Sequence, residues 1–284
     1  MFNFTKRNLK VFFRDRSTVL FSLLGPFVVI GLYMLFLGDL WGGSYRSSGV
    51  SGEMMDAWML AGMLAVTSVT TSMGAFGTMI ADRSRKIHKD FYCAPVRQQD
   101  VAAGYVLSTY LIGLILSFGT LVLAQLYMLL NGGHFLPMRT VGRVLLLLML
   151  IVFANSALMF FVTTLLRSEH AFTTVSTVIG MLIGFLTGTF VPVGLLPDYA
   201  QWLVKLFPPS HAASLLRSAI MEPYLLELEP ETGVESVSRL KQELGVGLSF
   251  GSWEMPSGGN LLVLLGTGVV FLLLAGGMLS RKQR

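Results

Sequence analysis

The chain has 284 residues, of which 53% are hydrophobic and only 13% charged, and its mean hydropathy is +0.66. Soluble domains carry about 25% charged residues, so this composition excludes an ordinary soluble domain and indicates an integral membrane protein. The net charge of +5 does not indicate nucleic-acid binding, because the basic residues gather beside the apolar stretches. The single cysteine, Cys93, excludes an intrachain disulfide, and we expect it to be inert.

The N-terminal segment, residues 1–18, mixes aromatic and basic side chains. Phe2, Leu9, Phe12 and Phe13 fit one helical stripe, and five Lys or Arg residues lie among them. This pattern predicts an amphipathic helix on the membrane surface. The alternative is an ordinary basic flank that only fixes the orientation of the chain.

Apolar stretches that approach the roughly 20 residues needed to cross a bilayer recur along the chain. Gly25-Pro26 predicts a kink in the first of them. We therefore expect an all-α integral membrane protein that forms a single domain over residues 1–284. Its six predicted transmembrane helices cover about 19–37, 57–80, 101–130, 144–166, 171–191 and 261–279.

The segment 82–97, between the second and third spans, is strongly basic. Five of its sixteen residues are Lys or Arg, and it also holds the apolar run Phe91-Tyr92-Cys93-Ala94-Pro95-Val96. A basic helix with aromatic residues offers both charge and an anchor to a partner protein. The alternative is a solvated loop that only sets orientation.

The long segment 192–260, between the fifth and sixth spans, begins apolar and ends acidic. We expect two short re-entrant or outer helices, 198–206 and 210–220, with Asp198 and Ser210 as their N-caps. Residues 222–255 are polar, with one further helix around Val234–Leu244. This part either binds a substrate or partner, or forms a solvated lid.

The distribution of charge predicts the orientation of the spans. With both termini placed inside, the segments 1–18, 81–100, 167–170 and 280–284 hold 14 of the 21 Lys and Arg residues. The same segments hold only five of the 16 Asp and Glu residues. Lys and Arg favour the cytoplasmic side, so we expect a multi-pass protein of the inner or plasma membrane with both termini in the cytoplasm.

The second and fifth spans are rich in Ser, Thr and Gly. Such residues allow close helix packing, and their hydroxyl groups either bond between helices or line a pathway. For each of these residues, the alternative to lining a pathway is a role in helix packing only. Our candidates for the lining of a translocation path are Thr67, Thr71, Thr174, Thr177 and Phe185.

No catalytic motif is evident. The chain has no G-x-x-x-x-G-K-[ST] loop, so we do not expect it to hold ATP in the usual way. Its four His and one Cys show no metal-ligand spacing. The middles of the spans lack ionisable residues, which argues against a carrier driven by protons through buried carboxylates. We therefore predict no catalytic residue, no metal and no cofactor on this chain.

Two stretches resemble the ABC-2 type permease family, the membrane subunits of ATP-driven exporters. Asp82-Arg83, the run 91–96 and Gly104-Tyr105 are similar to the family's acidic-Arg pair, its run ending in Pro-Val, and the Gly that opens span 3. Residues 192–217 resemble the segment after span 5. The chain departs from the family in having Arg85 and Lys86 where a Gly commonly follows the acidic-Arg pair.

The resemblance implies a coupling helix at 82–97 that docks into a separate ATPase subunit, with ATP and Mg bound by that partner. It implies a working unit of two ATPase chains and two membrane chains, the second being a copy or a homologue of this one, within the lipid bilayer. The docking residues would be Arg83, Arg85, Lys86, Phe91, Tyr92, Pro95 and Val96. Our own hypothesis is that span 5 and the broken segment after it form an outer gate, with Phe190, Pro192, Leu196 and Pro197 as candidate residues.

The predicted function is that of a membrane-spanning permease subunit of an ABC exporter, which moves an amphipathic drug, peptide or lipid outward. One alternative is a self-contained secondary transporter or channel. Such a protein would need a site for a driving ion, for which no buried carboxylate is evident. A second alternative is a membrane scaffold without transport activity.

Overall fold

The computed structural model describes residues 1–38, 40, 43, 45, 50–87, 98–166, 168–251 and 253–281. Within this part of the chain, five helices are long and apolar enough to cross a membrane, and the bent pair α2 (Arg16–Ser22) and α3 (Leu24–Leu32) makes a sixth if it is counted as one span. The all-α membrane fold is therefore confirmed. The five helices are α5 (Gly52–Ser84), α7 (Gln98–Leu130), α8 (Met138–Leu165), α9 (Glu169–Leu186) and α13 (Ser257–Arg281).

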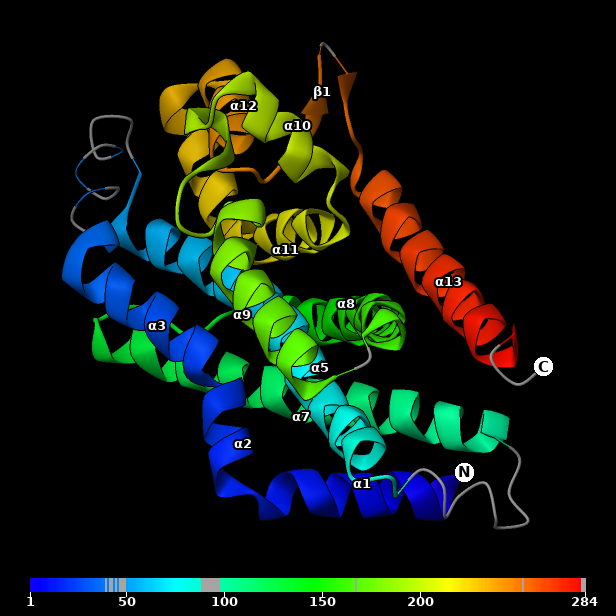
Figure 1. The fold of residues 1–284 in the computed structure, drawn as a ribbon. Coiled ribbons are helices and arrows are strands. Elements are labelled where there is room, and N and C mark those ends of the chain that lie inside the picture. Colours follow the sequence, from blue (N-terminus) through cyan, green and yellow to red (C-terminus); the bar gives the residue numbers. More distant parts are fainter. Residues whose placement is uncertain are drawn as a thin grey trace.

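Helix α5 forms the centre of the bundle (Figure 1). It packs against α3, α7, α8, α9 and α11 (Pro208–Thr232), and 89% of its most apolar 18-residue window is buried. The corresponding shares are only 11% for α9 and 22% for α13. The second span is thus enclosed by the chain's own helices, whereas α9 and α13 leave apolar side chains uncovered.

The first span is broken close to the predicted kink. Leu23 separates α2 from α3, and the two helices meet at an angle of 40°. Pro26 lies in the first turn of α3, where a missing N–H does not remove an intrahelical hydrogen bond. A π-helical turn, Tyr33–Leu37, follows α3.

Helix α1 (Phe2–Arg14) lies at one end of the bundle, beside the end of α5 (Figure 1). We call α1 and residues 82–87 the α1 end. Within the predicted apolar stripe, Phe12 is buried against the bundle, whereas Phe2 is 78% exposed. The buried face consists of Thr5, Asn8 and Phe12, since α1 packs on α7 through polar as well as apolar contacts.

Helix α9 ends at Leu186, five residues before the predicted end of the fifth span. Gly188 has a φ of +64°, and the N–H groups of Thr189 and Phe190 both bond to Gly184 O, so the chain turns back on itself. A 3₁₀ turn, η2 (Val193–Leu195), and the predicted helix α10 (Asp198–Leu206) follow. The N-cap of α10 is Pro197, and Asp198 is its first residue.

Helix α11 is much longer than the predicted 210–220 and runs through Pro223 and Pro230. An internal proline removes a hydrogen bond from a helix, but here Leu225 and Leu228 are buried against the core and stabilise the helical continuation. The prediction of Ser210 as an N-cap was wrong: its hydroxyl donates to Leu186 O at 2.6 Å, and Phe207 is the N-cap.

Helix α12 (Val234–Glu243) confirms the helix predicted in the acidic segment, with Val237, Leu240 and the adjoining Leu244 buried. It is followed by a short antiparallel hairpin of β1 (Ser249–Phe250) and β2 (Trp253–Glu254), which the sequence did not indicate. The indole of Trp58 on α5 donates to Leu244 O at 2.8 Å and anchors this part to the bundle. We call residues 187–256 the α12 end.

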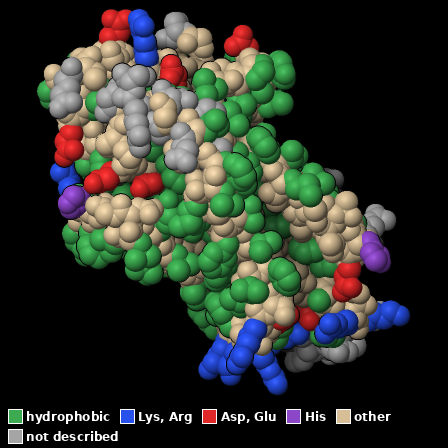
Figure 2. Space-filling view, turned by 90° about the vertical axis from the view of Figure 1, so that its left-hand side faces the viewer, with side chains coloured by type: hydrophobic (Ala, Val, Ile, Leu, Met, Phe, Trp, Pro, Cys, Tyr) green, Lys and Arg blue, Asp and Glu red, His purple; other side chains and the backbone are tan. Residues whose placement is uncertain are grey.

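Charge separates the two ends of the molecule. Figure 2 shows Lys and Arg side chains gathered at the α1 end, acidic side chains more numerous at the α12 end, and a hydrophobic band between them. This is the pattern expected for a protein whose middle lies in lipid.

Candidate functional site

The last turn of α5 carries a buried carboxylate that joins three helices. Asp82 is 6% exposed and accepts hydrogen bonds from both terminal nitrogens of Arg7 on α1, with 2.8 Å between Arg7 Nη2 and Asp82 Oδ1. Tyr105 on α7 donates its hydroxyl to Asp82 Oδ2 at 2.6 Å. The paired geometry is the strong form of an Arg–carboxylate contact, and it raises the pKa of Arg7 above its ordinary value.

The neighbouring Arg83 adds a fourth helix to this arrangement. Its Nη1 donates to Leu166 O, at the C-cap of α8, at 2.9 Å. A cation at a helix C-terminus satisfies an otherwise unpaired carbonyl and interacts favourably with the helix dipole. Asp82 and Arg83 therefore tie the end of α5 to α1, α7 and α8, and we call these two residues with Arg7 and Tyr105 the four-helix junction.

Close packing surrounds the junction. The ring of Phe4 meets that of Tyr105 edge-on, with 4.9 Å between their centroids. Gly104 lies so close to Phe4 that an added Cβ would come within 2.6 Å of its ring. Asn8 donates to Ser108 Oγ at 3.3 Å, which adds a second polar contact between α1 and α7. Helix α1 is thus fixed in both position and rotation on the end of the bundle.

The predicted docking residues fall into three groups. Arg83 is engaged in the junction, while Arg85 and Lys86 are exposed in the turn after α5, and Lys86 has a φ of +62°. Asp82 to Ser84 belong to α5 rather than to a separate helix, which corrects the predicted start of the 82–97 helix. Phe91, Tyr92, Pro95 and Val96 lie outside the described residues.

The predicted path residues do not share one surface of the chain. Thr67 and Thr71 are fully buried in α5, and their hydroxyls donate to the backbone of their own helix, at Met63 O and Thr67 O. Thr174 and Thr177 are exposed on α9, and their hydroxyls likewise bond to their own helix. Phe185 is half exposed and is the last residue but one of α9.

The predicted gate residues lie in the turn after α9. Phe190 folds back so that its ring meets that of Phe185 at 5.2 Å and covers Gly184. Pro192 is buried and precedes η2, Leu196 is half-buried, and Pro197 is exposed. These residues therefore sit together at the α12 end, directly after α9.

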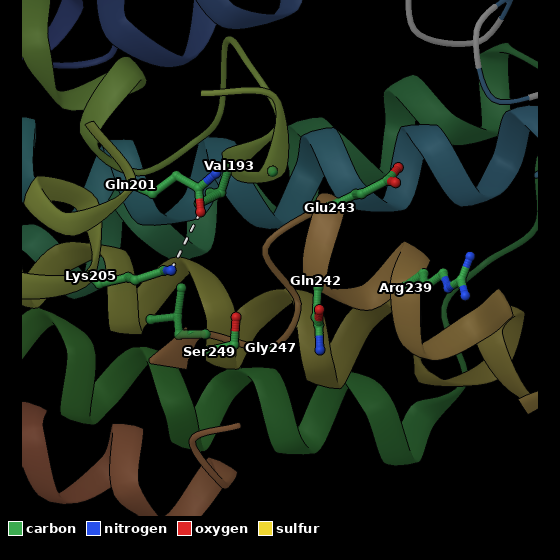
Figure 3. A pocket seen from close by; sticks show the side chains of 10 residues that line it. Val193, Gln201, Lys205, Arg239, Gln242, Glu243, Gly247 and Ser249 are labelled. Atoms are coloured by element: carbon green, nitrogen blue, oxygen red, sulfur yellow. Dashed lines mark hydrogen bonds between the residues drawn. The ribbon is translucent and has the colours of Figure 1, made fainter. Parts of the chain in front are cut away.

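A polar pocket of about 270 Å³ opens at the α12 end. Figure 3 shows Gln201 and Lys205 of α10 on one side of it and Gln242 of α12 on the other. Lys205 Nζ donates to Gln201 Oε1 at 3.4 Å. Within the described ranges, no three His, Cys, Asp or Glu side chains are grouped so that they could hold a metal ion.

Sequence reasoning missed the roles of Arg7 and Tyr105. Arg7 belongs to the basic N-terminal segment, but its partner lies 75 residues away, and no local pattern identifies such a contact. The sequence marks Tyr105 only by its place at the start of the third span. The four-helix junction could be seen only once the helices had been placed in space.

The comparisons agree with this architecture. The family model described as "ABC-2 type transporter" matches residues 1–221, which include the four-helix junction, the loop beside it and the turn after α9. No curated protein matches the chain. The matched region covers more than half of the sequence and extends from α1 into α11. The chain therefore belongs to the ABC-2 type transporter family and is a membrane permease subunit of that class.

Proposed function

We propose that this chain is the permease subunit of an ATP-driven ABC exporter that moves an amphipathic drug, peptide or lipid outward. A separate ATPase subunit, which binds ATP and Mg, supplies the energy. The observation that carries the proposal is the four-helix junction. It lies immediately before residues 88–97, so a force applied there would reach α1, α5, α7 and α8 through Asp82 and Arg83.

In this proposal the α1 end faces the cytoplasm. The concentration of Lys and Arg at that end supports this orientation. Arg85 and Lys86 are exposed where the ATPase would dock, and Phe91, Tyr92, Pro95 and Val96 would supply the apolar anchor. Arg83 would transmit the resulting movement through α8 rather than contact the ATPase itself.

The uncovered face of α9 supports a second membrane chain in the working unit. Val178, Met181, Leu182 and Phe185 are each about half exposed or more. In the proposed dimer this face, with Thr174 and Thr177, lies against the partner and borders the path. Phe190, Pro192, Leu196 and Pro197 then form the outer gate. Thr67 and Thr71 would be reached only if α5 rearranges, because both are enclosed in this conformation.

The test is transport by the purified complex in sealed vesicles. We expect ATP-dependent export that disappears without the ATPase subunit, while replacing Phe91 and Val96 with Ala leaves ATP hydrolysis intact and stops transport. Equal transport without the ATPase, driven by an ion gradient, would instead support the self-contained carrier. The matched control is Lys241→Ala, which lies at the α12 end and not at the α1 end, and which should leave coupling unchanged.

A further inference from the structure

Arg217 on α11 is a buried arginine held mainly by backbone oxygens. Its side chain is 1% exposed, and its Nη2 donates to Gly188 O at 2.7 Å, just after the end of α9. Nη1 makes a longer contact of 3.5 Å with Gly245 O, after α12. The guanidinium lies over the ring of Trp58, 5.1 Å from its centroid. One side chain thus links α5, α9, α11 and α12.

No carboxylate balances this charge within the part of the chain that the structure describes, and Arg217 Nε has no hydrogen-bond partner there. Burial lowers the pKa of Arg217 to about 9, so the group remains charged at neutral pH. A buried charge without a counter-ion is costly. Its favourable contacts are therefore the carbonyl-rich end of α9, where the helix dipole is negative, and the face of Trp58.

Two donors of α11 cap the end of α9. Ser210 donates to Leu186 O at 2.6 Å, and Arg217, two helical turns later, donates to Gly188 O. The two carbonyls that accept from Arg217 belong to glycines in tight turns. Gly188 has a φ of +64° and Gly245 a φ of +66°. An added Cβ would lie 2.4 Å from Val193 Cγ2 at Gly188 and 2.8 Å from it at Gly245. Only glycine presents these carbonyls to the guanidinium without strain.

We propose that Arg217 is a positioning residue that holds the end of α9 and the Phe185–Phe190 turn closed against α5 and α11. This inference rests on the proposed function, in which that turn is the outer gate. If α9 moves away from α11, Arg217 loses its short contact to Gly188 O, while Trp58 and Gly245 O supply no full replacement. The closed gate is therefore favoured until the movement of the other helices overcomes this contact.

The experiment uses the full chain in lipid nanodiscs, with Cys93→Ser and a single reporter, Thr189→Cys. Thr189 is 2% exposed in the turn behind Gly188. We expect slow reaction with a membrane-impermeant maleimide in the parent. Arg217→Met should raise the labelling rate about tenfold to a hundredfold, the factor expected for a lost charged hydrogen bond. Arg217→Lys, which keeps a charged donor, should restore much of the protection.

Two controls separate gating from unfolding. A second reporter, Val237→Cys, is buried in α12 away from α9 and should stay protected in every variant. Arg139→Met removes an exposed cation and should change neither reporter. The proposal is overturned if Arg217→Met leaves Thr189→Cys protected, exposes both reporters equally, or behaves like Arg217→Lys. The assay contains no ATPase or ATP, so its failure leaves ATP-driven export to be judged separately by the vesicle test.

Discussion

Tyr105 and Arg7 donate to the same oxygen of Asp82, with 2.6 Å between Tyr105 Oη and Asp82 Oδ2. The phenol on α7 and the guanidinium on α1 therefore depend on one carboxylate at the end of α5. Because the carboxylate is buried, each donor replaces a water molecule that Asp82 would otherwise bind. Removing one donor should weaken the attachment of both helices.

Tyr105→Phe should lower the free energy of unfolding by about 1.5–3 kcal/mol, the usual range for a hydrogen bond to a charged group. The ring and its edge-on contact with Phe4 are retained, so the change isolates the hydroxyl. Thermal unfolding in detergent measures the effect. Tyr199→Phe is the control, since Tyr199 is 74% exposed. Equal melting temperatures for the two variants would contradict the role of the Tyr105 hydroxyl.

Arg83 and Arg85 should behave differently although they lie two residues apart. Arg83→Gln removes the cation at the end of α8 and should cost about 1 kcal/mol of stability. Arg85→Gln changes an exposed side chain, so its stability should stay within about 0.5 kcal/mol, while its affinity for the ATPase subunit falls. Melting temperature and pull-down by the ATPase measure the two effects. If Arg83→Gln weakened docking and Arg85→Gln did not, then Arg83, and not Arg85, would be the residue that contacts the ATPase.

Much of the fold was predictable because hydrophobic length is a local property. The helices α5, α7, α8 and α13 lie close to the predicted spans, and α10 has the predicted bounds. The end of α9 was not predictable, because residues 187–191 are as apolar as the span itself and leave the helix through a turn at Gly188. The length of α11 was underestimated. Burial of Leu225 and Leu228 stabilises the helix beyond Pro223, and this outweighs the hydrogen bond that the proline removes.

The site was predictable only in part. Composition and motif resemblance drew attention to Asp82 and Arg83, but their partners Arg7 and Leu166 are distant in sequence. The burial of Arg217 could not be anticipated, since arginine is seldom fully buried without a counter-ion. Contacts of this kind depend on which helices meet, and hydrophobic periodicity determines only which face of a helix is buried.

Gly184→Ala should disturb the turn after α9. An added Cβ would lie 2.2 Å from the ring of Phe190, which therefore must move away from Phe185. We expect a loss of about 1–3 kcal/mol from overpacking, larger than the gain of up to about 1 kcal/mol in helix propensity. Gly276→Ala on α13 is the matched control, because its added Cβ would meet no atom within 4 Å. If both variants melt at the same temperature, Phe190 does not cover Gly184.

The uncovered face of α9 gives the last prediction. In a two-fold dimer, residues near the axis meet their own copies, and a disulfide forms only where the Cα atoms come within about 7 Å. In a Cys93→Ser background, single cysteines at Thr174, Thr177 and Met181 sample three successive turns of this face. We expect at least one of them to give an oxidised dimer on a non-reducing gel. Leu273→Cys, 72% exposed on α13, should stay monomeric. Equal cross-linking at Leu273, or none on α9, would place the partner chain elsewhere.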